Sequence, residues 1–331
     1  MTHAGGQWPA ALDETASQQQ SWIGAAGSGA LDPADPVGSS TTVGLALIDD
    51  VGFPGNWTLR ALGGPAAQED AIFHDRFQLS GPGDVFSDCT DCPTMVIIPA
   101  GSFTQGSPPD EPQSYSDERP QHTVNVPAFA MGQHEVTFDE WDACVADGGC
   151  THTPDDQGWG RGDRPVIAVN WNDAQQYVTW LSNKTGHTYR LPSESEWEYA
   201  TRAGTTGRFN TGDCITTDQA NFYGPDPAQG CPSGEYRGQT LPVGSFAPNA
   251  FGLYDTHGNV WEWVQDCWNG SYEGAPTDGS AWMSGDCSRA VLRGGSWSYD
   301  GRDVRSANRH WSPRGFRYGS LGFRVARSVA L

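Results

Sequence analysis

Residues 252–263 read GLYDTHGNVWEW, and residues 293–297 read RGGSW. Both stretches combine tryptophans, which bury large apolar areas, with glycines, which permit backbone turns that other residues disfavour. Residues 321–324 read LGFR and repeat the combination of glycine, aromatic ring and arginine near the end of the chain. This pattern predicts a domain of irregular loops and short strands around buried aromatic rings.

The composition of the whole chain also predicts a loop-rich globular protein. Of its 331 residues, 42 are Gly and 23 are Pro, while 14 Trp, 13 Phe and 10 Tyr supply the buried surface. So much glycine and proline excludes a helical bundle or a coiled coil. The sequence contains no run of about 18 apolar residues, so no transmembrane segment is expected. The first residues show neither the basic region nor the apolar core of a signal peptide.

The chain is strongly acidic, with a formal net charge of −21. Such a surface repels phosphate backbones, so no binding of nucleic acid is expected. The charge is unevenly distributed, because residues 289–327 contain nine arginines and only two acids, Asp300 and Asp303. Arginine suits buried ion pairs and planar hydrogen bonding better than lysine does. We therefore expect these arginines to hold the C-terminal segment against an acidic body.

Eight cysteines form four couples that are close in the sequence. They are Cys89/Cys92, Cys144/Cys150, Cys214/Cys231 and Cys267/Cys287. An even number of cysteines in short loops predicts disulfides and an oxidising compartment, so the protein is expected to be exported or displayed at a cell surface. The alternative, eight reduced cysteines in a cytoplasmic protein, stays open because no signal peptide is visible.

Three helices are expected. Residues 137–140 read TFDE and residues 193–196 read SESE, and both fit the capping box, in which Ser or Thr and a Glu three residues later satisfy each other's backbone N–H groups. Asn170 or Asn172 is expected to open a further helix that ends at Gly186.

The strands and helices together predict an α+β fold. Apolar residues at 95–99 predict a strand of the main domain, and residues 42–48 and 56–62 predict strands nearer the N-terminus. We expect residues 1–88 to form an N-terminal accessory module, rich in β-structure, and residues 89–331 to form the main domain.

An ordered series of motifs resembles the formylglycine-generating enzyme (sulfatase-modifying factor) family. The series comprises MVIIPAGSF at 95–103, EVT at 135–137, RPV at 164–166, VNW at 169–171, RLPSESEWE at 190–198, and the three stretches quoted first. The resemblance covers residues 92–327. It implies a C-type-lectin-like fold with little regular secondary structure, in agreement with the α+β prediction.

The resemblance also implies two structural Ca²⁺ sites with oxygen ligands. One would use the side chains of Asp255 and Glu262 and the carbonyls of Gly258 and Val260. The other would use the side chains of Asn221 and Glu235 and the carbonyls of Phe222 and Arg237, with Glu235 where the family more often has Asp. An alternative role for Glu262 is that of a buried partner of an arginine in the C-terminal segment.

The catalytic chemistry of the family is not expected to carry over. Its oxidases need two cysteines shortly after the Gly-Gly-Ser motif to bind copper, because thiolates are natural ligands of Cu(I). Here no cysteine follows Cys287. A sister branch holds non-haem iron in a His-rich helical domain, whereas the eight histidines here include no His-x-x-x-His-x-Glu pattern. We expect neither copper nor iron. The alternative is a divergent oxidase that has lost the cysteine pair.

Within residues 293–327, scaffold-like residues alternate with positions that use few residue types. These positions are Ser298, Tyr299, Asp300, Asp303, His310, Trp311, Ser312, Gly315, Phe316, Tyr318, Gly319 and Ser320. Apart from Trp311, each can be encoded by a codon of the form NNC, the set that randomising the adenines of AAC produces. The segment therefore resembles the variable region of a diversity-generating retroelement target protein, in which adenine-directed mutagenesis varies a ligand-binding face.

This second resemblance implies a noncatalytic, receptor- or adhesin-like protein that binds a protein or cell-surface ligand through its C-terminal face. Tyrosine, serine, glycine, histidine and tryptophan are residue types that suit such a surface. We expect seven side chains to be exposed together: Tyr299, Asp300, Asp303, His310, Trp311, Phe316 and Tyr318. We expect six to be buried: Arg293, Trp297, Arg305, Arg309, Phe323 and Arg324. In the rival case of an enzyme, the region would form a narrow pocket with converging polar groups.

Overall fold

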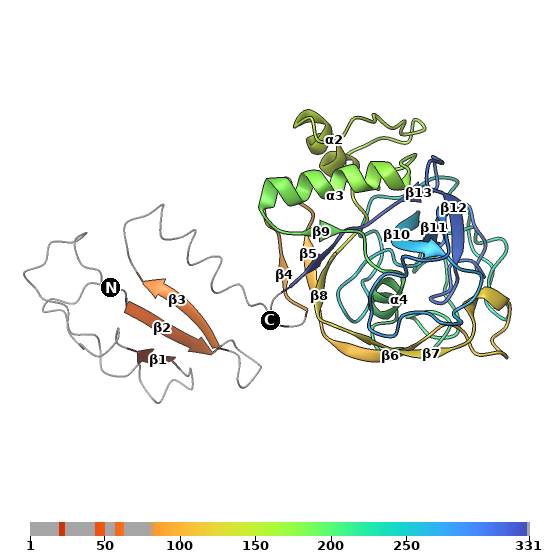
Figure 1. The fold of residues 1–331 in the computed structure, drawn as a ribbon, viewed down its shortest axis with the longest axis horizontal. Coiled ribbons are helices and arrows are strands. Elements are labelled where there is room, and N and C mark those ends of the chain that lie inside the picture. Colours follow the sequence, from red (N-terminus) through yellow and green to blue (C-terminus); the bar gives the residue numbers. More distant parts are fainter. Residues whose placement is uncertain (1–19, 24–43, 50–56, 63–80, 82, 330–331) are drawn as a thin grey trace, which may run out of the picture. The chain divides into compact units, whose positions relative to one another are not determined.

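The computed structural model describes residues 20–23, 44–49, 57–62, 81 and 83–329. The chain divides into two compact units, Met1–Ser80 and Gly81–Leu331. In the first unit, three strands form an antiparallel sheet in the order β1-β2-β3 (Figure 1). They are β1 (Gln20–Ile23), β2 (Gly44–Asp49) and β3 (Trp57–Leu62). The last two correspond to the strands predicted at 42–48 and 56–62.

The second unit begins ahead of the boundary predicted between residues 88 and 89. Strand β4 (Val85–Phe86) pairs with β5 (Met95–Ile98), and the Cys89–Cys92 disulfide lies in the connection between these two strands. The ladder hydrogen bonds of β4 therefore make it part of the main domain.

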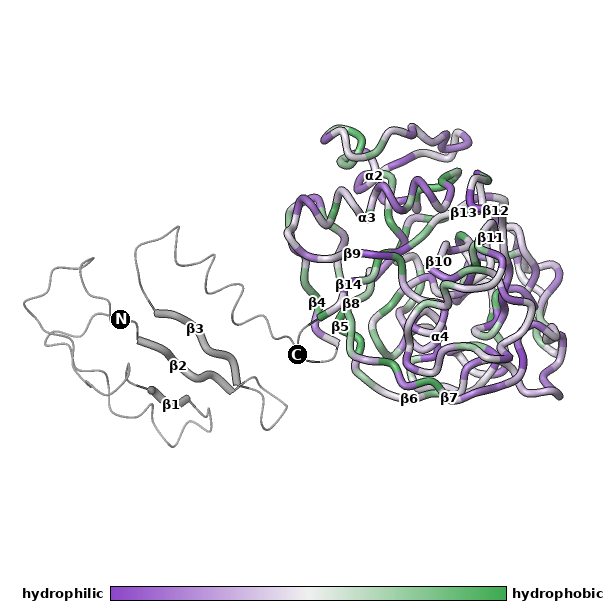
Figure 2. The backbone as a smooth tube through the Cα atoms, in the orientation of Figure 1, coloured by the Kyte–Doolittle hydropathy of each residue, from purple (hydrophilic) through white to green (hydrophobic). Residues whose placement is uncertain are grey.

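A five-stranded antiparallel sheet carries much of the core of this unit. Its order is β4-β5-β8-β14-β9, with β8 (Phe129–Gly132), β9 (Tyr189–Arg190) and β14 (Ala326–Ser328). Every residue of β5 and β8 is buried, and Figure 2 shows hydrophobic residues along both strands. Because β14 lies between β8 and β9, the end of the chain is built into the middle of the sheet.

A second sheet of four strands contains two strands of the C-terminal segment, β12 and β13. Its order is β12-β11-β10-β13, with β10 (Trp261–Trp268), β11 (Asp286–Arg293), β12 (His310–Pro313) and β13 (Leu321–Gly322). Strand β13 runs parallel to β10, whereas the other pairs are antiparallel. Strands β6 (Gly101–Gln105) and β7 (His122–Val126) form a separate hairpin.

The three expected helices are present, and their capping residues are those that the sequence indicated. They are α2 (Phe138–Ala146), α3 (Trp171–Thr185) and α4 (Glu194–Arg202), with a short 3-10 helix, η2 (Ser116–Glu118). Thr137, Asn170 and Ser193 each accept a hydrogen bond from the third backbone N–H of their helix. Asn170 rather than Asn172 caps α3, and Gly186 ends it with φ of +74°. Within the described residues, none of the helices is long and apolar enough to cross a membrane.

All four cysteine couples form disulfides, as predicted. The Cα–Cα distances are 5.0 Å for Cys89–Cys92, 5.3 Å for Cys144–Cys150, 5.4 Å for Cys214–Cys231 and 4.5 Å for Cys267–Cys287. These distances lie in the usual range for disulfides, so each short loop brings its cysteines together without a further change of the backbone. No free cysteine is left.

Candidate functional site

Four arginines of the C-terminal segment have side chains that are fully buried. Arg305 donates to both carboxylate oxygens of Glu118, at 2.6 and 2.8 Å, and to Glu111 at 2.6 Å. Arg309 makes the same two-pronged contact with Glu194, at 2.6 and 2.9 Å. The side chains of these two arginines, like those of Arg293 and Arg324, are 0% exposed. The bidentate geometry fixes the position of each arginine as well as its charge.

The other two arginines attach the ends of the segment. Arg293 donates to Glu198 of α4 at 2.5 Å, and Arg324 donates to both oxygens of Glu262 on β10, at 2.7 and 2.8 Å. Arg293 also donates to the backbone carbonyls of Ala307 and Ser306, at 2.9 and 3.0 Å. The segment is therefore held at four places by ion pairs that water does not reach, as its charge predicted.

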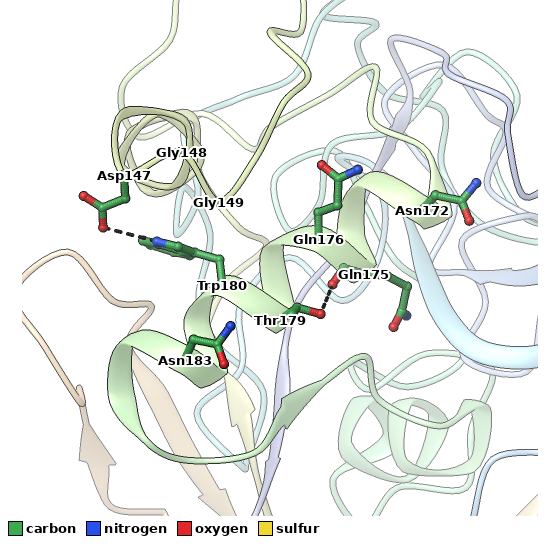
Figure 3. Close-up of a pocket in the computed structure, with 9 residues that line it drawn as sticks. All are labelled: Asp147, Gly148, Gly149, Asn172, Gln175, Gln176, Thr179, Trp180 and Asn183. Atoms are coloured by element: carbon green, nitrogen blue, oxygen red, sulfur yellow. Dashed lines mark hydrogen bonds between the residues drawn. The ribbon is translucent and has the colours of Figure 1, made fainter.

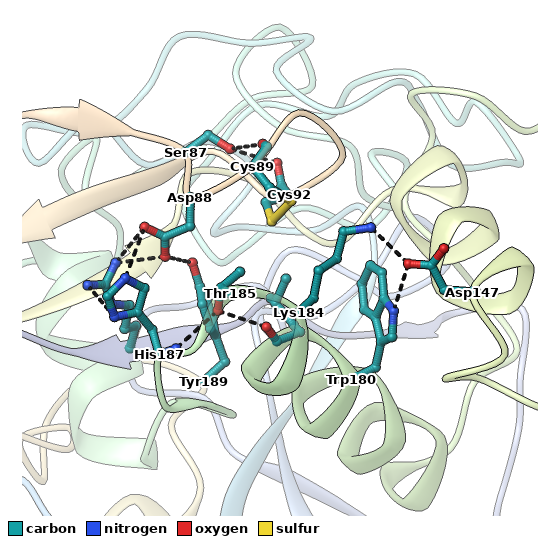
Figure 4. Close-up of a disulfide and its surroundings, with 12 residues drawn as sticks. Ser87, Asp88, Cys89, Cys92, Asp147, Trp180, Lys184, Thr185, His187 and Tyr189 are labelled. Atoms are coloured by element: carbon teal, nitrogen blue, oxygen red, sulfur yellow. Dashed lines mark hydrogen bonds and ion pairs between the residues drawn. A yellow bond between two sulfur atoms is a disulfide. The ribbon is translucent and has the colours of Figure 1, made fainter. Parts of the chain in front are cut away.

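The last arginine of the segment, Arg327, pairs with Asp88. Asp88 lies next to the Cys89–Cys92 disulfide (Figure 4). Arg327 donates to both oxygens of Asp88, at 2.8 and 2.7 Å, and the Tyr189 hydroxyl donates to the same carboxylate. The disulfide thus stiffens the loop that supplies the arginine's partner.

Between these attachment points, the predicted ligand-binding residues lie at or near the surface. Exposed are His310, Gly315, Phe316 and Tyr318. Partly buried are Ser298, Tyr299, Asp300, Asp303, Trp311, Gly319 and Ser320. Two groups of rings result: Tyr299, His310 and Trp311, with centroid separations of 6.5 and 6.2 Å, and Phe316 with Tyr318, at 5.7 Å. We call the exposed and partly buried members of this set the C-terminal face.

Several of the expected placements are wrong. Of the seven side chains expected to be exposed together, four are partly buried: Tyr299, Asp300, Asp303 and Trp311. Ser312 is buried, because it lies directly opposite the fully buried Ala290 on the neighbouring strand and so shares its face of the sheet. Trp297 was expected in the core, but it is only partly buried. Its indole N–H donates to the carbonyl of Gly319 at 3.1 Å, and its ring belongs to a group of surface rings.

That group is a row of four aromatic rings that sequence reasoning missed, and we call it the aromatic strip. Tyr223 contacts Tyr236 at a centroid distance of 4.9 Å, Tyr236 stacks on Trp297 at 6.1 Å, and Trp297 meets Trp159 edge-on at 5.1 Å. Tyr223 and Tyr236 are 36% and 45% exposed. The rings come from separate loops, and no local sequence pattern connects them.

Three carboxylates adjoin the Tyr223 end of the strip. The Tyr223 N–H donates to the carbonyl of Tyr299 at 2.8 Å, and the Gly301 N–H donates to the carbonyl of Asp226 at 2.8 Å. Burial, together with the negative charges of Asp303 and Asp226, raises the pKa of Asp300 to about 6. Negative charge therefore accumulates beside the rings.

Comparison with known proteins identifies the domain. The model of the sulfatase-modifying factor enzyme 1-like domain matches residues 82–329. The chain belongs to this family. Bovine formylglycine-generating enzyme is 31% identical over 320 residues, which cover 79% of this chain and 83% of that enzyme. The family's C-type-lectin-like fold, mixed α+β and rich in loops, is the fold that the sequence predicted.

Two solved structures of this family's fold resemble the chain. PvdO from Pseudomonas aeruginosa has a TM-score of 0.68 and 42% identity, covering 76% of this chain and all of PvdO. Treponema denticola variable protein 1 has a TM-score of 0.60 and 26% identity, covering 74% of this chain and 99% of that protein. The chain also matches the serine/threonine-protein kinase Pkn1 of Chlamydia trachomatis at 30% identity over 71% of its own length, but it spans only 38% of that kinase.

The residues of the two expected calcium sites in this sulfatase-modifying-factor domain differ in how well they suit a metal ion. Both oxygens of Glu262 bind Arg324, and one also accepts the indole N–H of Trp197 at 2.8 Å, so Glu262 takes the alternative role considered above. Asp255 accepts the Gly244 N–H at 2.7 Å, and burial raises its pKa to about 6. No group of three or more His, Cys, Asp or Glu side chains suited to a metal occurs among the described residues.

Asn221 is different, because its side-chain oxygen is buried and accepts no hydrogen bond from any described residue. Its amide nitrogen donates to the carbonyl of Gln239 at 2.9 Å, which points the oxygen the other way. Glu235, in contrast, is exposed and pairs with Arg237. An unpartnered oxygen suits a hard cation, so the Asn221 half of the predicted site fits calcium.

Cavities lie elsewhere on the domain, along α3. One of about 450 Å³ is lined by the amides of Asn172, Gln175, Gln176 and Asn183, among others (Figure 3). A second, of about 540 Å³, shares two of these amides. Neither cavity is lined by any residue of 293–327, so neither coincides with the predicted site.

Removing one of the buried arginines tests their structural role. Arg305→Met leaves Glu118 and Glu111 buried without a cation, so the free energy of unfolding should fall by about 3–5 kcal/mol in urea titrations. The control is Lys184→Met, which breaks the exposed pair with Asp147 and should change stability little. Equal stability of the Arg305 variant and the wild type would show that the pair does not hold the segment.

The raised pKa of Asp266 predicts how the free energy of unfolding depends on pH. Burial first, and then the charge of Glu194, raises the pKa of Asp266 to about 7 from its ordinary 3.8. The folded state therefore binds the proton more tightly, and this carboxyl lowers stability as the pH rises from about 4 to about 7. The free energy of unfolding of Asp266→Asn, relative to wild type, should rise over this range. Asp278→Asn should show no such trend, because the hydrogen bond from the Ser280 side chain lowers the pKa of that exposed carboxyl instead of raising it. Parallel curves for wild type and Asp266→Asn would contradict the assignment.

Proposed function

We propose that the protein is a noncatalytic, receptor- or adhesin-like protein whose C-terminal face binds a protein or cell-surface ligand and is varied by a retroelement. One observation carries the proposal. A single segment contains four arginines with fully buried side chains and, between Arg309 and Arg324, two aromatic residues, Phe316 and Tyr318, that are 47% and 53% exposed.

A diversified surface requires this separation of buried framework residues from exposed residues. A position that accepts many side chains must not contribute to the core, where a mismatch costs about 1–5 kcal/mol. Here the framework depends on arginines and on Phe323, which is 0% exposed, whereas the positions proposed to vary are exposed or partly buried, apart from Ser312. Large aromatic side chains exposed on a monomer also favour a binding surface.

The relatives and the cysteines support the same conclusion. The family contains enzymes, but it also includes the Treponema denticola variable protein 1, whose fold this chain shares over 74% of its length. All eight cysteines are paired in disulfides, so no thiol is available for the metal chemistry of the family's oxidases. Four disulfides also favour an oxidising compartment, outside the cytoplasm.

The face should tolerate substitution. Replacing His310, Phe316 and Tyr318 together by alanine should change the free energy of unfolding by less than about 1 kcal/mol, because these side chains are exposed. Phe323→Ala, a matched aromatic deletion in the core, should cost about 3–5 kcal/mol. Urea denaturation followed by circular dichroism measures both. Unfolding of the triple variant would refute a freely variable face.

Sequencing of the flanking DNA gives a separate test of the retroelement. We expect a reverse transcriptase gene and a near-identical template repeat that differs from residues 298–320 at codons containing adenine. An unvarying segment with no such repeat, together with oxidation of a cysteine peptide by the purified protein, would favour the divergent oxidase instead.

We also propose that Ca²⁺ binds at Asn221, because the orphaned oxygen there is buried. About 1 mM Ca²⁺ should raise the melting temperature of the wild type, since an ion that binds only the folded state stabilises it. The rise should be lost in Asn221→Ala and kept in Asn183→Ala, which removes an exposed amide on α3. Because Asn221→Ala also loses a hydrogen bond, the quantity compared is the calcium-induced shift. An equal shift in both variants would place any calcium elsewhere.

A further inference from the structure

The aromatic strip leaves ring faces open that elsewhere in the molecule are covered by cations. Arg289 lies 3.7 Å from the ring centroid of Trp311, Arg314 lies 3.9 Å from that of Trp171, and Arg302 lies 4.2 Å from that of Tyr115. Among the described residues, no lysine or arginine lies over Trp159, Tyr223, Tyr236 or Trp297. Tyr223 and Tyr236, which are 36% and 45% exposed, therefore offer ring surface to a cation from another molecule, and the partly buried Trp159 and Trp297 extend that surface.

We propose that the aromatic strip binds lysine and arginine side chains of a protein partner. The faces of tryptophan and tyrosine rings attract an ammonium or guanidinium group placed within about 6 Å of the ring centroid. The three ring pairs are inclined at 71°, 16° and 83°, so the strip offers faces in more than one direction. Several cationic side chains of one extended segment can thus be held along it.

Charge complementarity favours a cation over a neutral or anionic ligand. Asp226 is exposed at the end of the turn that begins with Tyr223, and its N–H donates to the Tyr223 carbonyl at 3.3 Å. Asp300 and Asp303 are partly buried beside it, and Arg302 lies 3.9 Å from Asp303 as the nearest paired cation. Arg305, the other cation that acts on Asp303, is already paired with Glu111 and Glu118. The three carboxylates therefore leave net negative charge, which an incoming lysine or arginine neutralises.

The same charge disfavours the other ligands that stack on aromatic rings. A nucleic acid or a phosphocholine headgroup would bring phosphate against these carboxylates, on a protein whose net charge is −21. A sugar chain would stack on the rings but would leave the carboxylates uncompensated. The inference rests on the proposed function, because Trp297 and Asp300 belong to the same C-terminal segment. It extends the binding surface to Trp159, Tyr223 and Tyr236, which lie outside that segment.

A lysine peptide and its neutral counterpart test the inference. The hexapeptide (Gly-Lys)₃ should bind in calorimetric or NMR titrations, and acetylation of its lysine side chains should weaken binding at least about tenfold by removing the cation. Tyr236→Ala, at an exposed position where unfolding is not expected, should weaken binding about two- to fivefold. Asp300→Asn should also weaken it. Phosphocholine should bind less well than the lysine peptide.

The controls separate the strip from general attraction to an acidic protein. Met283→Ala removes an exposed apolar side chain, and Glu273→Gln removes an exposed carboxylate, both outside the strip and the C-terminal face. Neither should change the affinity. Binding that responds to Glu273→Gln as strongly as to Asp300→Asn, or ignores Tyr236→Ala, would overturn the inference. So would equal binding of the acetylated peptide, or no binding at all. If the peptide test fails in this way but the variant with His310, Phe316 and Tyr318 replaced by alanine still folds normally, the inference is wrong and the proposed function stands.

Discussion

Buried pairing of arginine with glutamate is the interaction on which the rest of the structure depends. The side chains of Arg293, Arg305, Arg309 and Arg324 are 0% exposed, and each meets a glutamate that is at most 3% exposed. Taking such charges out of water costs nearly as much as the pairing returns, so their net contribution to stability is modest. Breaking one pair is costly, however, because a lone buried charge is left. The pairs therefore select a single path for the segment rather than simply adding stability.

That division of roles would allow the C-terminal face to be both ordered and variable, as the proposed function requires. Arg293 reaches α4, Arg305 reaches η2 and Arg324 reaches β10, so the segment is anchored on three different elements. Between the anchors, side chains such as Phe316 and Tyr318 are exposed, so exchanging them should cost little stability. A face held by its own apolar side chains would lose its shape whenever one of them changed.

Structural features that depend on residues close in the sequence could be predicted from it. Contacts between residues that are distant in the sequence could not. Caps such as Thr137 and Ser193 act within four residues, and each disulfide joins cysteines at most 20 positions apart, so both were visible. Segregation of arginine from acid predicted that the arginines would be buried. It could not name Glu118 as a partner, because that residue lies 187 positions from Arg305. The aromatic strip was hidden for the same reason, and Trp297, expected in the core, proved to be part of it.

The same pairing decides what a ligand meets at the surface. Nine arginines in the C-terminal segment suggest a basic region, yet four of them are fully buried and neutralised by glutamates. Another, Arg327, is taken up by Asp88. Of the other four, which lie at or near the surface, three pair with carboxylates: Arg289 with Asp286, Arg302 with Asp303 and Arg317 with Asp173. A partner approaching this side therefore meets little unpaired positive charge on a protein whose net charge is −21, although the local sequence is its most basic part.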